Sequence, residues 1–147
     1  MVQTLLTFQN PTTGGFGLYD ADGSDTDLTA MALQALAPYQ KSNAGANAAI
    51  KRGLEYLKTG LNAEYAYTSP STGAQVLLTL AALKLDVNKA GFGNEYRNLV
   101  STLYEMILEN SKVSFDTLQV YQAFEAYRRY IAVSYTHLRA HETSAHL

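Results

Sequence analysis

The chain has 147 residues, a net charge of −2, 47% hydrophobic residues and no cysteine. This length suffices for one domain with a sizeable buried core. Its 11 basic residues are scattered rather than clustered, which argues against a nucleic-acid partner. The lack of cysteine excludes disulfides, thiolate zinc sites and a cysteine nucleophile from this sequence. No apolar run approaches the roughly 20 residues of a membrane span, and the first residues do not resemble a signal peptide.

The first predicted helix covers residues 28–37, which carry no charge and are apolar on nearly every side. A helix of this kind must be surrounded by protein. Ser24 to Asp27, just before it, matches a capping box, in which a side chain at the helix start accepts a backbone N–H. Its carboxylates would also interact favourably with the helix dipole.

The second predicted helix, residues 45–59, is amphipathic. Its apolar stripe of Ile50, Leu54 and Leu57 lies opposite charged side chains, as on a surface helix with one buried face. Gly60 follows as a typical glycine stop.

The later helices repeat this alternation. Residues 74–83 are again apolar throughout and follow the helix-start residue Ser69, whereas residues 95–109 are amphipathic and are expected to begin at Asn94. The last helix, residues 115–131, is mixed. Fully apolar helices alternating with amphipathic ones predict inner helices wrapped by outer ones. No segment has a strand pattern, so we expect an all-α fold.

Three segments align at a constant spacing. They begin at positions 29, 73 and 117, and read TAMALQAL, GAQVLLTL and TLQVYQAF, which is a period of 44 residues. Periods of this size are typical of helix-pair repeats. The sequence therefore predicts about three such repeats.

The first repeat also carries family-like motifs. The segment LTFQN at 6–10, the Gly14-Gly15-Phe16 turn and the acidic lead into TAMALQAL resemble the prenyltransferase and squalene-cyclase repeat of α/α-toroid proteins. Residues 71–75 and 117–119 are similar to degenerate copies of that repeat. The resemblance implies that residues 1–132 form a partial α/α toroid, about half a ring. On this view the chain is a fragment whose partner is the remainder of the parent toroid.

Within this superfamily, the chain is most similar to toroid domains of bacterial surface proteins, which in turn resemble the cobalamin-binding transcobalamin group. That resemblance implies a non-catalytic ligand-binding or adhesion domain, extracellular or at the cell surface. A structural repeat spacer without a ligand is a further alternative.

The acidic segment, residues 20–27, also permits an enzymatic interpretation. Class II terpene cyclases carry an Asp-x-Asp-Asp-Thr-Ala motif in which the middle aspartic acid protonates the substrate. The similar stretch here places Asp27 as that acid, with Asp25 before it, but Leu28 replaces the next carboxylate. A general acid at neutral pH needs a raised pKa, which a neighbouring carboxylate helps to provide. The missing neighbour weakens this alternative.

Two other interpretations of the segment remain open. Asp20, Asp22 and Asp25 surround Gly23 and would offer hard oxygen ligands to Ca²⁺, although the spacing departs from the EF-hand loop. The simplest alternative is a solvated loop that ends in a helix cap, with Asp25 and Asp27 interacting favourably with the helix dipole.

Tyrosines provide candidate ligand contacts. In a toroid, loops at the ends of the inner helices surround the central cavity. Tyr19, Tyr65 and Tyr67 are therefore candidates to line the opening of a ligand-binding cavity. Aromatic faces with few polar groups suit a flat apolar ligand, including a cobalamin-like one, or a glycan. Ordinary packing of these rings is the alternative.

Residues 133–147 form a tail that we set apart from the fold. Its segment 134–143, SYTHLRAHET, resembles the peptide obtained when a sequencing adapter is translated. All three histidines lie in this tail, and His137 and His141 are spaced to share one helix face as metal ligands. We interpret residues 133–147 as non-native and exclude them from fold reasoning.

Overall fold

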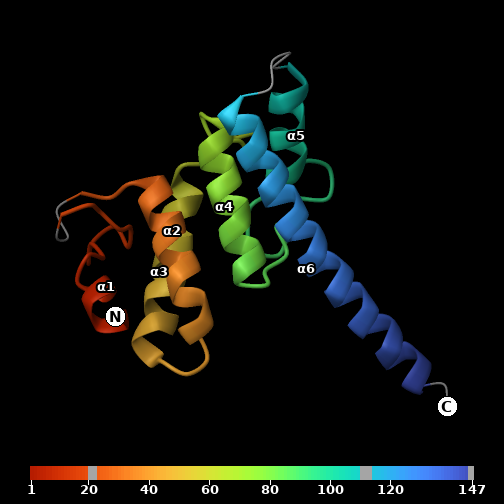
Figure 1. Ribbon diagram of the computed structural model, residues 1–147, viewed down its shortest axis with the longest axis horizontal. Coiled ribbons are helices and arrows are strands. Elements are labelled where there is room, and N and C mark those ends of the chain that lie inside the picture. The colour runs from red at the N-terminus through yellow and green to blue at the C-terminus, as the bar shows by residue number, and fades with distance from the viewer. Residues whose placement is uncertain (20–22, 110–113, 146–147) are drawn as a thin grey trace.

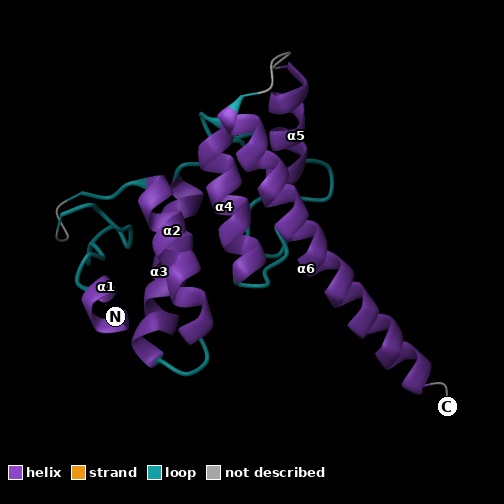
Figure 2. Ribbon diagram, in the orientation of Figure 1, coloured by secondary structure: helices purple, strands orange, loops and turns teal. Residues whose placement is uncertain are grey.

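The computed structural model describes residues 1–19, 23–109 and 114–145, and within these ranges the regular structure is helical, without a strand. The all-α prediction is confirmed. The described residues form six α-helices and one short 3₁₀ helix (Figure 2): α1 Val2–Leu6, α2 Thr26–Leu36, η1 Ala37–Tyr39, α3 Ala44–Thr59, α4 Pro70–Ala82, α5 Leu99–Glu109 and α6 Phe115–Ala145.

The helices form two groups by direction and packing. Helices α2, α4 and α6 run in the same direction, and α4 packs against both of its neighbours in this row (Figure 1). Helices α3 and α5 run the opposite way, with α3 packed on α2, and α5 on α4 and α6. Helix α1 lies against α3. We refer to α2, α4 and α6 as the inner row.

Polar side chains fix three helix starts. Asp25 accepts a hydrogen bond from the Leu28 amide at 2.9 Å, and Asn43 and Ser69 cap α3 and α4 in the same way. The cap at Ser69 is as predicted. At α2, however, Asp25 caps the helix in place of Ser24, so the predicted capping box is wrong by one residue.

The predicted start of α5 was also wrong. The side chain of Asn94 accepts the amides of Tyr96 and Arg97 within a turn, rather than opening a helix. Helix α5 begins at Leu99, after Asn98, whose side chain accepts the amides of residues 100 and 101. Both asparagines are good acceptors for free amides, and sequence alone does not distinguish a turn from a helix start.

Small residues bring the two groups of helices close together. A β-carbon on Gly53 of α3 would lie 2.6 Å from Leu33 of α2, and one on Gly73 of α4 would lie 2.6 Å from Leu103 of α5. Real β-carbons do not approach so closely, so each glycine makes room for a leucine of the facing helix. Leu33 and Leu103 are buried in consequence.

The two fully apolar helices differ in how completely they are covered. Helix α4 is surrounded by α2, α5 and α6, as predicted. Helix α2 leaves Met31 53% exposed and Ala35 exposed as well, contrary to the expectation that it is covered on every side. Within the described residues, nothing precedes α2 in the inner row.

The family-like motifs of the first repeat hold the N-terminal segment onto α3. The buried Gln9 amide donates to the Gly14 and Ala49 carbonyls at 2.8 and 2.9 Å, and its oxygen accepts from Arg52 at 2.6 Å. Phe16, after the glycine pair, is buried in the core. These residues have a structural role here.

The tail continues α6 as a single helix that projects away from the rest of the fold (Figure 1). Every residue from 131 to 143 is exposed, so this part of α6 adds nothing to the core. His137 and His141 lie on it, and His146 lies outside the described residues.

Candidate functional site

Tyr19 lines a shallow recess before α2. The recess has a volume of about 450 Å³ and is formed by residues 17–19 and 23–25 together with Leu28. Tyr19 is 79% exposed and supplies the aromatic face of this recess. Of the candidate calcium ligands, only Asp25 can be placed, because Asp20 and Asp22 lie outside the described residues.

The two aspartates of the cyclase-like motif have different surroundings. Asp25 caps α2, because its side chain accepts a hydrogen bond from the Leu28 amide. Asp27 lies in the first turn of the same helix, and its buried Oδ1 atom has no hydrogen-bond partner among the described residues. A buried carboxylate oxygen without a partner is costly, so Asp27 is an unusual feature of the helix start.

Tyr65 and Tyr67 belong to a different loop, between α3 and α4. Tyr67 is buried, its hydroxyl donates to the Leu57 carbonyl at 2.5 Å, and burial raises its pKa well above the ordinary value of 10. Gly60 makes room for this ring, since a β-carbon there would lie 2.9 Å from it. The predicted stop at Gly60 is therefore confirmed, with close packing as its reason rather than a left-handed backbone.

Tyr65 acts through its backbone. It has a left-handed φ of 60°, and its carbonyl accepts from the Thr102 hydroxyl at 2.9 Å, which ties the loop to α5. No residue of this loop lines the recess at Tyr19. Among the described residues, the three candidate tyrosines are therefore not brought together in one recess.

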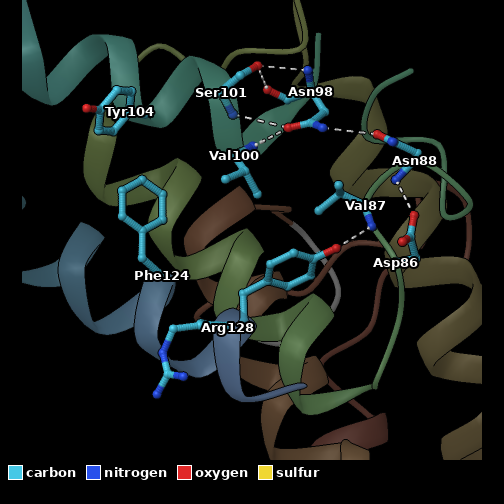
Figure 3. Close-up of a pocket in the computed structure, with 10 residues that line it drawn as sticks. Asp86, Val87, Asn88, Asn98, Val100, Ser101, Tyr104, Phe124 and Arg128 are labelled. Atoms are coloured by element: carbon cyan, nitrogen blue, oxygen red, sulfur yellow. Dashed lines mark hydrogen bonds between the residues drawn. The ribbon is translucent and has the colours of Figure 1, made fainter. Parts of the chain in front are cut away.

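A larger cavity lies between α5, α6 and the segment after α4 (Figure 3). Its volume is about 650 Å³, and we call it the α5–α6 groove. The residues that line it are Asp86, Val87, Asn88, Asn98, Val100, Ser101, Tyr104, Phe124, Tyr127 and Arg128. The volume lies in the range of small-molecule sites.

The walls of the groove are apolar. Tyr104 and Phe124 project from α5 and α6 on one side of it, and Val100 and Val87 on the other (Figure 3). Val87 is buried and Phe124 is half-buried, so these walls are anchored in the core. Aromatic and branched side chains of this kind suit an apolar ligand.

Polar groups at the edge of the groove mostly bond to one another. The Tyr127 hydroxyl accepts from the Val87 amide at 3.0 Å, and Asn98 donates to Asn88 at 3.2 Å. Arg128 forms two 2.9 Å hydrogen bonds with Glu125. This arrangement orders the groove and leaves its walls to provide most of the contact with a ligand.

Sequence reasoning did not identify this groove. Its lining comes from three segments spread over residues 86–128, and helical periodicity shows only that each segment has an apolar side. The available signal was the close spacing of Phe124, Tyr127 and Arg128 on one predicted helix, two aromatic rings followed by a cation.

No protein-family model, curated protein or solved structure matches this chain. In the part of the chain that the structure describes, no helix combines the length and hydropathy of a membrane span. Nor do three or more histidine, cysteine or acidic side chains gather there as a metal site would require.

Proposed function

We propose that the chain is a non-catalytic segment of an α/α toroid, and that it binds an apolar ligand in the α5–α6 groove. The toroid part rests on the parallel inner row and the 44-residue spacing of its sequence motifs. The ligand part rests on one observation, the apolar groove of about 650 Å³ with Tyr104 and Phe124 in its wall.

The proposal places the chain in a binding or adhesion protein outside the cell or at its surface, as the resemblance to bacterial toroids implies. Its partner is the remainder of a toroid, made of further repeats of the same kind. The ligands that fit the resemblance are a cobalamin-like molecule, another small apolar compound or a glycan.

A fluorescence titration tests the groove. The probe is anilinonaphthalene sulfonate, an apolar dye that brightens when it leaves water. Tyr104→Ala removes an exposed wall of the groove at little cost to the fold, and loss of one aromatic contact should weaken dye binding about fivefold. Tyr96→Ala, which removes an exposed ring outside the groove, is the matched control. Equal dye affinity in the two variants contradicts the proposal, and a dye-positive protein is then screened with cobalamin and glycans.

Asp27 supports a second candidate function. Its buried, unpartnered Oδ1 favours the proposal of a cyclase-like enzyme in which this carboxyl group protonates a polyprenyl substrate. Asp27→Asn should then abolish product formation, whereas a wild-type chain that does not turn over such a substrate argues against this function. The structural-spacer alternative predicts neither turnover nor a ligand.

A further inference from the structure

The three inner-row helices leave different surfaces uncovered at equivalent positions. With the 44-residue period, the aligned residues of α2, α4 and α6 are Ala30, Ala74 and Leu118, followed by Leu33, Leu77 and Tyr121. The members in α2 and α4 are fully buried, whereas Leu118 is 55% and Tyr121 is 59% exposed. The third helix therefore lacks a cover that the first two have.

The contact between α2 and α4 shows what covers such a position. The Thr79 hydroxyl of α4 donates to the Ala30 carbonyl of α2 at 2.9 Å. The Gln34 amide of α2 donates to the Gln75 side chain of α4 at 3.2 Å. Positions 30 and 34 of one inner helix thus face positions 75 and 79 of the next.

Helix α6, which packs on α4, buries the equivalent positions: Gln119 is half-buried and Ala123 is fully buried. Gln119 of α6 is the counterpart of Gln75, but the position of its donor, Gln34, is taken by Leu78. Accordingly, the buried Oε1 atom of Gln119 has no partner among the described residues. Thr79 is likewise replaced by Ala123, so neither hydrogen bond of the α2–α4 contact has an equivalent here, and the burial of the two positions is what supports the alignment of the repeats.

Each end of the inner row then carries one unused half of this interface. On α6, Leu118 and Gln122 are the counterparts of Ala30 and Gln34, and both are exposed; we call them the trailing face. On α2, Met31 and Ala35 are the counterparts of Gln75 and Thr79, and both are exposed; we call them the leading face. Neither face carries a charge.

We propose that the trailing face of one molecule binds the leading face of a second copy, so that the partner's α2 continues the inner row beyond α6. The inference rests on the repeat alignment of the proposed function, but not on its ligand. The contact joins two different surfaces, so it leaves one face free on each molecule and leads to a closed ring or a longer chain of copies.

Sedimentation velocity on the full chain tests this proposal. We expect the sedimentation coefficient to increase with protein concentration up to about 100 μM, as it does for a protein interface of modest affinity. Met31→Glu and Leu118→Lys each place a charge on one face and should weaken association at least tenfold. An equimolar mixture of the two variants should recover it, because the unchanged trailing face of Met31→Glu can then bind the unchanged leading face of Leu118→Lys.

Tyr96→Glu places the same charge on an exposed residue outside both faces and should associate like the wild type. Circular dichroism verifies that all three variants keep their helices. A wild-type protein that stays monomeric overturns the proposal, as does association unaffected by the two face variants. Dye binding to the monomeric variants is measured separately, so that a failure of the groove and a failure of the association are told apart.

Discussion

The contact between Gly53 and Leu33 gives a prediction whose sign depends on the packing of α3 on α2. Gly53→Ala in an open helix would stabilise the protein by about 1 kcal/mol through helix propensity. Here the new β-carbon would lie 2.6 Å from Leu33 Cδ2 and 3.0 Å from Cδ1, and overpacking of this kind costs about 1–3 kcal/mol. We therefore expect the substitution to destabilise the wild-type protein by up to about 2 kcal/mol.

The same substitution should become stabilising when Leu33 is shortened. Leu33→Ala removes a fully buried side chain and should cost about 2–5 kcal/mol. In that background the residue 53 β-carbon enters the space left by the leucine, so Gly53→Ala should return about 1 kcal/mol or more. The two sites should thus couple by about 1–3 kcal/mol.

Urea unfolding followed by circular dichroism at the helical band measures the four free energies of unfolding in this cycle. Ala48→Gly, at an exposed position of the same helix, measures the helix-propensity term alone and is the matched control. If Gly53→Ala changes the free energy of unfolding equally in both backgrounds, the described packing of α2 against α3 is refuted.

Three further predictions concern charge, burial and the tail. Arg128 and Arg129 lower the pKa of Glu125 from 4.5 to about 2 by hydrogen bonding. The contribution of this carboxylate to stability is therefore present above pH 4.5 and is lost as the pH falls toward 2. In urea titrations between about pH 5 and 2, the free energy of unfolding of Glu125→Gln should depend less on pH than that of the wild type. Tyr67 should stay protonated above pH 10, because burial raises its pKa, and stability should fall as the pH rises further. Burial also raises the pKa of Tyr127, so an absorbance titration of Tyr67→Phe should lose one of the late tyrosine steps and keep the other, and an unchanged titration contradicts this. Truncation after residue 132 should change the free energy of unfolding by less than about 0.5 kcal/mol, since the removed side chains from 133 to 143 are exposed. A larger decrease in the free energy of unfolding would show that the tail belongs to the fold.

Helix periodicity predicted α2 to α5 because each has an apolar face or is apolar throughout, whereas α6 continues to Ala145, beyond its predicted end at residue 131. The other errors lie at helix starts, where several polar residues compete for the same role. At α2, the Asp25 amide donates to the Phe16 carbonyl at 3.0 Å, which holds residue 25 in an extended conformation suited to a cap. Ser24 instead forms a hydrogen bond with Thr13. That choice depends on a contact nine residues away, which no capping pattern contains.

The candidate site was harder to predict than the fold. Tyr19, Tyr65 and Tyr67 are equally plausible in a list of aromatic residues, but one is exposed, one acts through its backbone and one is buried. The α5–α6 groove exists because the segment after α4 folds back to Tyr127 of α6. Such a tertiary contact has no local signal in the sequence.

Cross-linking of two single-cysteine variants tests most directly the central claim that the two ends of the inner row carry complementary faces. The chain has no cysteine, so Ala35→Cys and Leu118→Cys each introduce one thiol, at the counterparts of Thr79 and Ala30, which are hydrogen-bonded across the α2–α4 contact. Directly facing side chains bring their β-carbons to about 4 Å, the separation that a disulfide requires. The account predicts a covalent dimer when the two variants are mixed and mildly oxidised, and little cross-linking when either is oxidised alone. A dimer formed as readily by one variant alone, or none in the mixture, would contradict it.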